Sequence, residues 1–76
     1  MTTLASAKVG QCGKILHVEG LDDVAIRLLE MGLLPGVDFE MLGIAPLGDP
    51  IEIEIRGYRL SLRKSEAARI TIELNV

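Results

Sequence analysis

Aromatic side chains are nearly absent from this sequence of 76 residues, which contains one phenylalanine, one tyrosine and no tryptophan. Domains that grip proline-rich peptides do so with grooves lined by several aromatic rings. Phe39 and Tyr58 cannot line such a groove by themselves. The composition therefore disfavours recognition of proline-rich peptides.

Cysteine and histidine are equally scarce, with one residue of each. A single cysteine, Cys12, excludes a disulfide within the chain, and small secreted domains usually depend on disulfides. We therefore expect an intracellular protein. Cys12 and His17 are also the only soft metal ligands, whereas a structural zinc site usually has four ligands.

The spacing of Cys12 and His17 also argues against a shared metal ion. In a regular strand their odd separation places the two side chains on opposite faces of the sheet, although a bulge at Gly13 would change this. The simplest interpretation makes Cys12 a small core residue and His17 a surface residue of a strand. We predict no cofactor and no resident metal, and a metal shared between two chains stays an alternative.

Excess positive charge and long apolar runs are missing too. The net charge is −3, which disfavours a general nucleic-acid binder because Lys and Arg supply most of that affinity. The start of the chain lacks the basic and apolar segments of a signal peptide. An uncharged run such as residues 41–47 is too short to span a bilayer. We expect a cytoplasmic protein that does not insert into the membrane, so any membrane role requires a partner.

Motifs that carry catalysis are not recognisable in the sequence. It has no phosphate-binding loop, no HExxH and no CxxC motif. Glu52 and Glu54 alternate with isoleucines, so they fit the solvated face of a strand better than a catalytic pair. We therefore predict a protein that is not an enzyme.

The chain does contain a series of short segments with alternating apolar and polar residues, punctuated by eight glycines. This alternation is typical of strands with one buried face. Five short strands with one α-helix between the first two predict one mainly β domain over residues 1–76, folded as a small, partly open barrel. The strands are predicted at 14–19, 37–45, 51–55, 58–63 and 70–75, the helix from Asp22 or Asp23 to about Met31, and one helical turn at 65–68.

Local signals predict how these elements are joined. Gly32 is expected to end the helix in a left-handed conformation. Pro35 and Gly36 fit the two central positions of a type II turn. Gly43 is a predicted bulge that lets its strand bend. A hairpin that turns at Arg56-Gly57 places Ile55 opposite Tyr58 and Ile53 opposite Leu60 on the inner face. It also places Glu54 opposite Arg59 as an ion pair on the outer face.

The predicted helix is more apolar than a surface helix needs to be. Its apolar side chains cover an arc of about 220°, whereas a stripe a little wider than 100° is normal. Two interpretations stay open. Either neighbouring loops cover the additional side chains, or Ile26 and Leu29 border an exposed apolar patch that docks a partner.

Cationic residues gather around the second strand of the predicted hairpin. The simpler interpretation is a solvated edge whose cations pair with Glu52 and Glu54, and such pairs contribute little to stability. The alternative is a patch that meets an acidic protein surface or phosphates. The group comprises Arg56, Arg59, Arg63 and Lys64.

Three motifs, in order, resemble those of the FeoA family of ferrous iron transport proteins. Residues 27–36 read RLLEMGLLPG, residues 45–51 read APLGDPI, and residues 58–67 read YRLSLRKSEA. Each motif is weak alone, but the ordered set in a chain of this length is typical of the family. Residues 9–10 and 13–15 fit the family's opening, whereas residues 5–7 depart from it because leucine is common there.

The resemblance implies an SH3-like barrel in the cytoplasm, held at the inner membrane only through a partner. It also implies an accessory or regulatory role in bacterial ferrous iron uptake beside FeoB, a membrane transporter with a cytoplasmic G-protein domain. The family offers a partner rather than a reaction. A metal-responsive sensor or carrier, similar to the C-terminal SH3-like domain of iron-dependent repressors, is the alternative.

We therefore predict a protein-interaction module that binds the cytoplasmic region of FeoB. Loops stiffened by Pro and Gly lose little entropy when they meet a partner, although the same residues also serve as tight turns that hold the barrel. Whether the chain forms a homo-oligomer stays open. The predicted contact residues are Ile26, Leu29, Leu34, Pro35, Gly36, Pro46, Leu47, Gly48 and Asp49.

Overall fold

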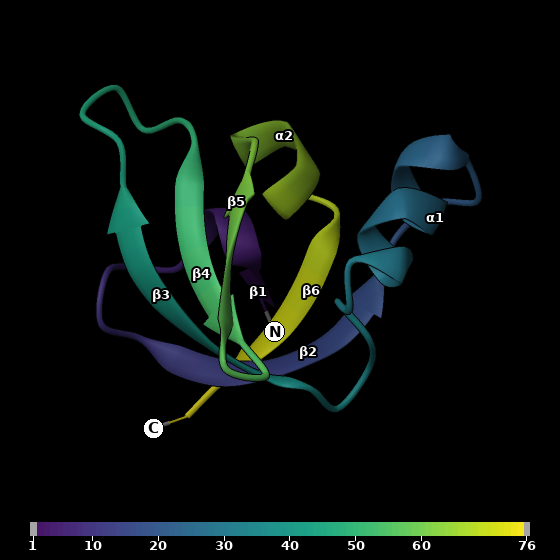
Figure 1. The fold of residues 1–76 in the computed structure, drawn as a ribbon, viewed down its shortest axis with the longest axis horizontal. Coiled ribbons are helices and arrows are strands. Elements are labelled where there is room, and N and C mark those ends of the chain that lie inside the picture. The colour runs from purple at the N-terminus through teal and green to yellow at the C-terminus, as the bar shows by residue number, and fades with distance from the viewer. Residues whose placement is uncertain (1, 76) are drawn as a thin grey trace.

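The computed structural model describes residues 2–75. Its strands form one antiparallel sheet in the order β1-β6-β2-β3-β4-β5, and Figure 1 shows that the sheet is strongly curved. Helix α1 (Asp23–Glu30) follows β2, the single-turn helix α2 (Lys64–Ala67) follows β5, and a 3-10 turn η1 (Leu4–Ser6) follows β1. The strands are β1 (Thr2–Thr3), β2 (Cys12–Val18), β3 (Asp38–Ile44), β4 (Ile51–Ile55), β5 (Tyr58–Leu62) and β6 (Ile70–Leu74).

This architecture confirms the predicted mainly β fold with a helix between two strands. One strand was not predicted: β1, which adds a sixth strand to the expected five. It pairs with β6 through Thr2 opposite Ile72 and Thr3 opposite Thr71. Two residues are too few to show alternation, so their pattern carries no strand signal.

The core lies inside the curled sheet and is dominated by aliphatic side chains. The three isoleucines of β4 are all buried, while Glu54 between two of them is exposed. This is the period-2 pattern on which the strand prediction depended. The largest side chains that are almost fully buried are Leu4, Ile15, Leu28, Leu33, Met41, Ile53, Ile55, Leu62, Ile70 and Ile72.

The hairpin of β4 and β5 has the predicted register, with Ile55 opposite Tyr58 and Glu54 opposite Arg59. The predicted bulge is also confirmed, because the pairing of β3 with β4 shifts register between Met41 and Gly43. The outer ion pair is wrong: among residues 2–75, Glu54 and Arg59 face each other without forming one. Tyr58 is 42% exposed, so it does not complete the inner face.

Strand β2 corrects two expectations about Cys12 and His17. The strand has a register shift between Ile15 and His17 in its pairing with β6. This bulge reverses the alternation, so Cys12 and His17 are both exposed rather than lying on opposite faces. Cys12 is therefore not a core residue. The two residues are about 16 Å apart along the strand, which is too far for both to hold one metal ion.

Both ends of α1 follow the predicted local signals. The Asp22 carboxylate accepts a hydrogen bond from the Ala25 amide at 3.2 Å, which caps the first turn. At the other end Gly32 has φ of 103°, and the amides of Gly32 and Leu33 donate to the carbonyls of Leu29 and Leu28. This is a Schellman motif, and it requires a left-handed residue at the position of Gly32.

Candidate functional site

Helix α1 contributes few side chains to the core. Only Ala25 and Leu28 of its residues are buried. Ile26 is 50% exposed and Leu29 is 38% exposed. Neighbouring loops therefore do not cover the additional apolar side chains, and the helix presents part of its apolar surface to solvent.

The predicted contact residues in the loops lie on separate parts of the surface. Leu34, Pro35 and Gly36 are exposed in the turn between α1 and β3, where the Val37 amide donates to the Leu34 carbonyl at 3.1 Å and Gly36 has φ of 87°. This confirms the type II turn. The second loop, residues 45–50, joins β3 to β4 far from that turn in Figure 1. It exposes Pro46, Leu47 and Asp49, with Gly48 half-buried.

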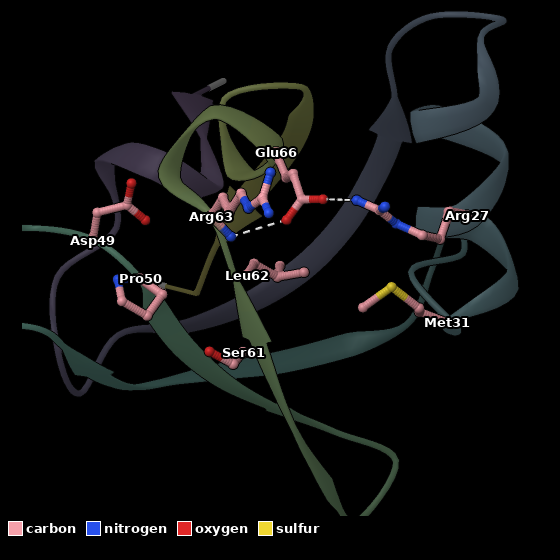
Figure 2. A pocket seen from close by; sticks show the side chains of 8 residues that line it. All are labelled: Arg27, Met31, Asp49, Pro50, Ser61, Leu62, Arg63 and Glu66. Carbon is pink, nitrogen blue, oxygen red and sulfur yellow. Dashed lines mark hydrogen bonds and ion pairs between the residues drawn. The ribbon is translucent and has the colours of Figure 1, made fainter.

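An open groove of about 680 Å³ lies between α1 and the loop of residues 45–50. Figure 2 shows Arg27 and Met31 on the α1 side and Asp49 and Pro50 on the loop side, with the end of β5 between them. The full lining is Arg27, Met31, Asp49, Pro50, Ser61, Leu62, Arg63 and Glu66.

The short helix α2 connects the two sides of this groove. Glu66 forms an ion pair with Arg27 of α1 and also accepts a hydrogen bond from the Arg63 amide at 2.9 Å. The Asp49 carboxylate accepts a hydrogen bond from the Lys64 amide at 3.0 Å. These contacts link α1, α2 and the loop that carries Asp49.

A second ion pair holds the start of α1. The Arg69 guanidinium donates to both carboxylate oxygens of Asp22, at 2.5 and 2.8 Å. This hydrogen bonding, together with the hydrogen bond from the Ala25 amide, lowers the pKa of Asp22 to about 2. The same contact raises the pKa of Arg69. Asp22 thus both caps the helix and ties it to the beginning of β6.

The end of α1 is held by the hairpin. The Tyr58 hydroxyl donates to the Met31 carbonyl at 2.5 Å. A Cβ atom at Gly32 would lie 2.5 Å from that hydroxyl oxygen, so the close approach also requires glycine there. Met31, whose carbonyl accepts this hydrogen bond, also lines the groove, as do the paired Arg27 and Glu66.

The polar side chains that line the groove are exposed or half-buried. Within residues 2–75 no polar or charged residue is buried, and no group of three His, Cys, Asp or Glu side chains is placed to hold a metal ion. The described helices also contain no segment long and apolar enough to cross a membrane.

Of the predicted contact residues, Asp49 lines the groove, whereas most of the other lining residues were not singled out from the sequence. Arg27 and Glu66 are separated by 39 positions and Asp22 and Arg69 by 47. No local pattern links charges so far apart. The sequence signal that did point here was the cationic group around β5, which includes Arg63.

Comparison with solved structures defines the class of the fold. The NMR structure of a FeoA-like protein from Clostridium acetobutylicum superposes with a TM-score of 0.92 at 35% identity, covering 99% of this chain and 87% of that one. The zinc-complexed crystal structure of FeoA from Stenotrophomonas maltophilia, described as a prokaryotic SH3 domain protein, gives 0.80 at 26% identity, covering 96% and 91%. The fold is therefore a small SH3-like β-barrel, as the resemblance implied.

The family follows from the sequence itself. The family model described as FeoA domain matches residues 2–74. A fusion protein of Fe(2+) transport protein A and Fe(2+) transporter FeoB from Porphyromonas gingivalis is 38% identical over 71 residues, which are 93% of this chain. This chain belongs to the FeoA family, which is associated with ferrous iron transport. It spans only 8% of the length of that curated relative.

Proposed function

We propose that this protein is an accessory of bacterial ferrous iron uptake that binds the cytoplasmic G-protein region of a FeoB-type transporter and regulates it by contact. The observation that carries the proposal is the fusion of the two proteins in Porphyromonas gingivalis. A fusion keeps two domains at high effective concentration, which is useful when they act on each other. The proposal places the chain in the cytoplasm, at the membrane only through its partner.

The exposed side chains of α1 support a role for this helix in the contact. Ile26 and Leu29 add apolar area that no part of residues 2–75 covers. Apolar side chains at the centre of an interface contribute much of its affinity. Leu34 and Leu47, exposed by 37% and 97%, extend the candidate surface on two loops.

Co-purification with the soluble cytoplasmic region of the FeoB from the same organism tests the proposal. We expect capture by the unchanged chain and loss of capture by Ile26→Glu, a substitution that keeps a good helix former at an exposed site. The matched control is Val9→Glu, because Val9 is 59% exposed but lies outside α1 and the groove. No capture of the FeoB region by the unchanged chain, with or without guanine nucleotide, would contradict the proposal.

The metal sensor alternative has less support. Cys12 and His17 are exposed but separated along β2, and Cys12 is flanked across the strands by Glu40 rather than by a further soft ligand. Calorimetric titration with Fe²⁺ separates the two functions. Stoichiometric binding that is lost in Cys12→Ala would favour the sensor.

A further inference from the structure

We propose that the free edge of β5 binds an extended acidic segment of a partner protein as an additional strand. This inference builds on the proposed function, since it names how the groove side of the molecule binds. It also makes a claim that does not depend on FeoB, because the edge geometry and the charge around it belong to this chain alone.

The hairpin turn determines which backbone groups of β5 face outward. The turn has two residues, Arg56 with φ of 49° and Gly57 with φ of 84°, so Ile55 and Tyr58 form the hydrogen-bonded pair beside it. Antiparallel pairs alternate between bonded and non-bonded positions. With no register shift in this ladder, Arg59 and Ser61 turn their amides and carbonyls away from β4.

These outward groups have no partner among residues 2–75. No hydrogen bond from another segment reaches the backbone of Arg59 or Ser61, and β5 is the last strand in the sheet order. Arg59 and Ser61 are about 7 Å apart along the strand, the repeat that an added antiparallel or parallel strand matches. The edge therefore offers four hydrogen-bonding groups in strand geometry. The other edge, β1, has only two residues.

The groove provides space beside this edge. Ser61 and Leu62 line it from the end of β5, and Arg63, the residue between β5 and α2, lines it next to them. In Figure 2 the side chains of Arg27 and Met31 lie across the groove from this end of β5. An added strand would thus contact the edge on one side and Met31 on the other.

The charge around the edge selects an acidic occupant. Three cations of the described chain, Lys14, Arg27 and Arg69, form ion pairs. The cations on and around β5 form none, although Glu52 and Glu54 lie on the adjacent strand. A second copy pairing through β5 would place arginines against arginines, which disfavours self-association. The unpaired group is Arg56, Arg59, Arg63 and Lys64.

The first test uses a short synthetic peptide that alternates glutamate with valine, titrated into the ¹⁵N-labelled chain. We expect chemical-shift changes and slowed hydrogen exchange at the amides of Arg59 and Ser61, with binding that weakens as NaCl is raised. The same peptide with lysine in place of glutamate should cause no change. Equal effects of both peptides, shifts confined to another surface, or no shift at the solubility limit would overturn the proposal.

A second test separates strand addition from ordinary ionic contact. Ser61→Pro removes an outward amide. The fold should be preserved, because proline is tolerated on the free side of an edge strand. Peptide binding should weaken roughly tenfold, because one backbone hydrogen bond to the peptide is lost. Ser61→Ala keeps the amide and should bind as the unchanged chain does. Arg59→Glu should weaken binding roughly fivefold, whereas Lys8→Glu, outside the edge, should not. Ser61→Pro that binds normally would contradict strand addition.

The peptide experiments and the FeoB capture experiment can fail independently, so they test the added strand and the proposed function separately. Capture of the FeoB region without peptide binding at β5 would reject the added strand and keep the transporter as partner. Peptide binding at β5 without capture of the FeoB region would keep the added strand and reject the transporter as partner. Concentration-dependent shifts of Arg59 and Ser61 without peptide would identify a second copy as the occupant and overturn the acidic partner.

Discussion

The barrel and helix α1 are held in different ways. The strands β2, β3, β4 and β6 are paired on both sides, and their inward side chains form the core. Helix α1 buries only Ala25 and Leu28, and Figure 1 shows it standing beside the barrel rather than inside it. Val24 and Met31 pack against the core while half-buried. The polar attachments are Asp22 with Arg69, Arg27 with Glu66, and the hydrogen bond from Tyr58.

This difference means that the barrel and α1 respond differently to mutation, salt and pH. A buried aliphatic core costs several kcal/mol to disturb, whereas exposed ion pairs contribute little and respond to salt and pH. The barrel includes the edge strand β5, and α1 lies beside it with fewer buried side chains. A partner bound in the groove as proposed would contact both parts at once.

The largest effect is expected from removing core volume. Ile53 is fully buried on β4, so Ile53→Ala should lower the free energy of unfolding by about 2–5 kcal/mol. The control Ile26→Ala, on the half-exposed face of α1, should change it by less than about 1 kcal/mol. Urea denaturation followed by circular dichroism measures both. Similar losses for the two variants would remove the distinction between barrel and helix.

The next largest effect concerns the end of α1. Gly32→Ala places a Cβ atom against the Tyr58 hydroxyl at a backbone φ of 103°, which we expect to cost about 1–3 kcal/mol of unfolding free energy. Gly43→Ala is the matched control, because a Cβ there meets nothing within 4 Å. It should stay within about 0.5 kcal/mol of the unchanged chain. Equal thermal melting of both variants would contradict the described end of the helix.

A smaller effect is expected from the hydrogen bond between hairpin and helix. Tyr58→Phe keeps the ring but removes the donor to the Met31 carbonyl, with an expected loss of about 0.5–1.5 kcal/mol. Hydrogen exchange should quicken at the amides of Met31 and Gly32, near the end of α1, and stay unchanged in β4. Faster exchange throughout the barrel would mean that Tyr58 supports the core instead.

The smallest effect is a dependence on pH. The pKa of Asp22 is lowered to about 2 by Arg69 and the Ala25 amide, so its contribution is present above the ordinary carboxyl pKa and is lost as pH falls toward 2. Asp22→Asn keeps an N-cap but loses the charge. The stability difference between the two chains should be constant from about pH 5 to 8 and shrink between about pH 4 and 2. A difference that grows on acidification would exclude this ion pair.

Local patterns predicted much of the fold. The alternation of isoleucine and glutamate over residues 51–55 defined β4 and its register, and Gly32 and Asp22 marked the helix ends. The bulge in β2 was missed because nothing around Leu16 distinguishes it from a regular strand. That single shift moved His17 relative to Cys12 and reversed the expectation about their faces.

The candidate site was less predictable than the fold. The excess of apolar residues on α1 left open whether Ile26 and Leu29 are covered, and the structure shows both exposed. The groove depends on contacts between distant charges. Glu66 has several cations nearby in the sequence, yet its ion pair is with Arg27, 39 positions away. Only the three-dimensional arrangement shows which cations stay unpaired around β5.

Hydrogen exchange of the whole chain, alone and with the soluble FeoB region, tests the central claim most directly. In the free chain we expect the amides of β4 to exchange far more slowly than those of α1, because β4 buries three isoleucines inside the sheet whereas the helix buries only two side chains. On binding, exchange should slow in α1 and at Arg59 and Ser61 on β5, with little change in β2. Protection confined to β2 and β3, or equal protection of α1 and β4 in the free chain, would contradict the account.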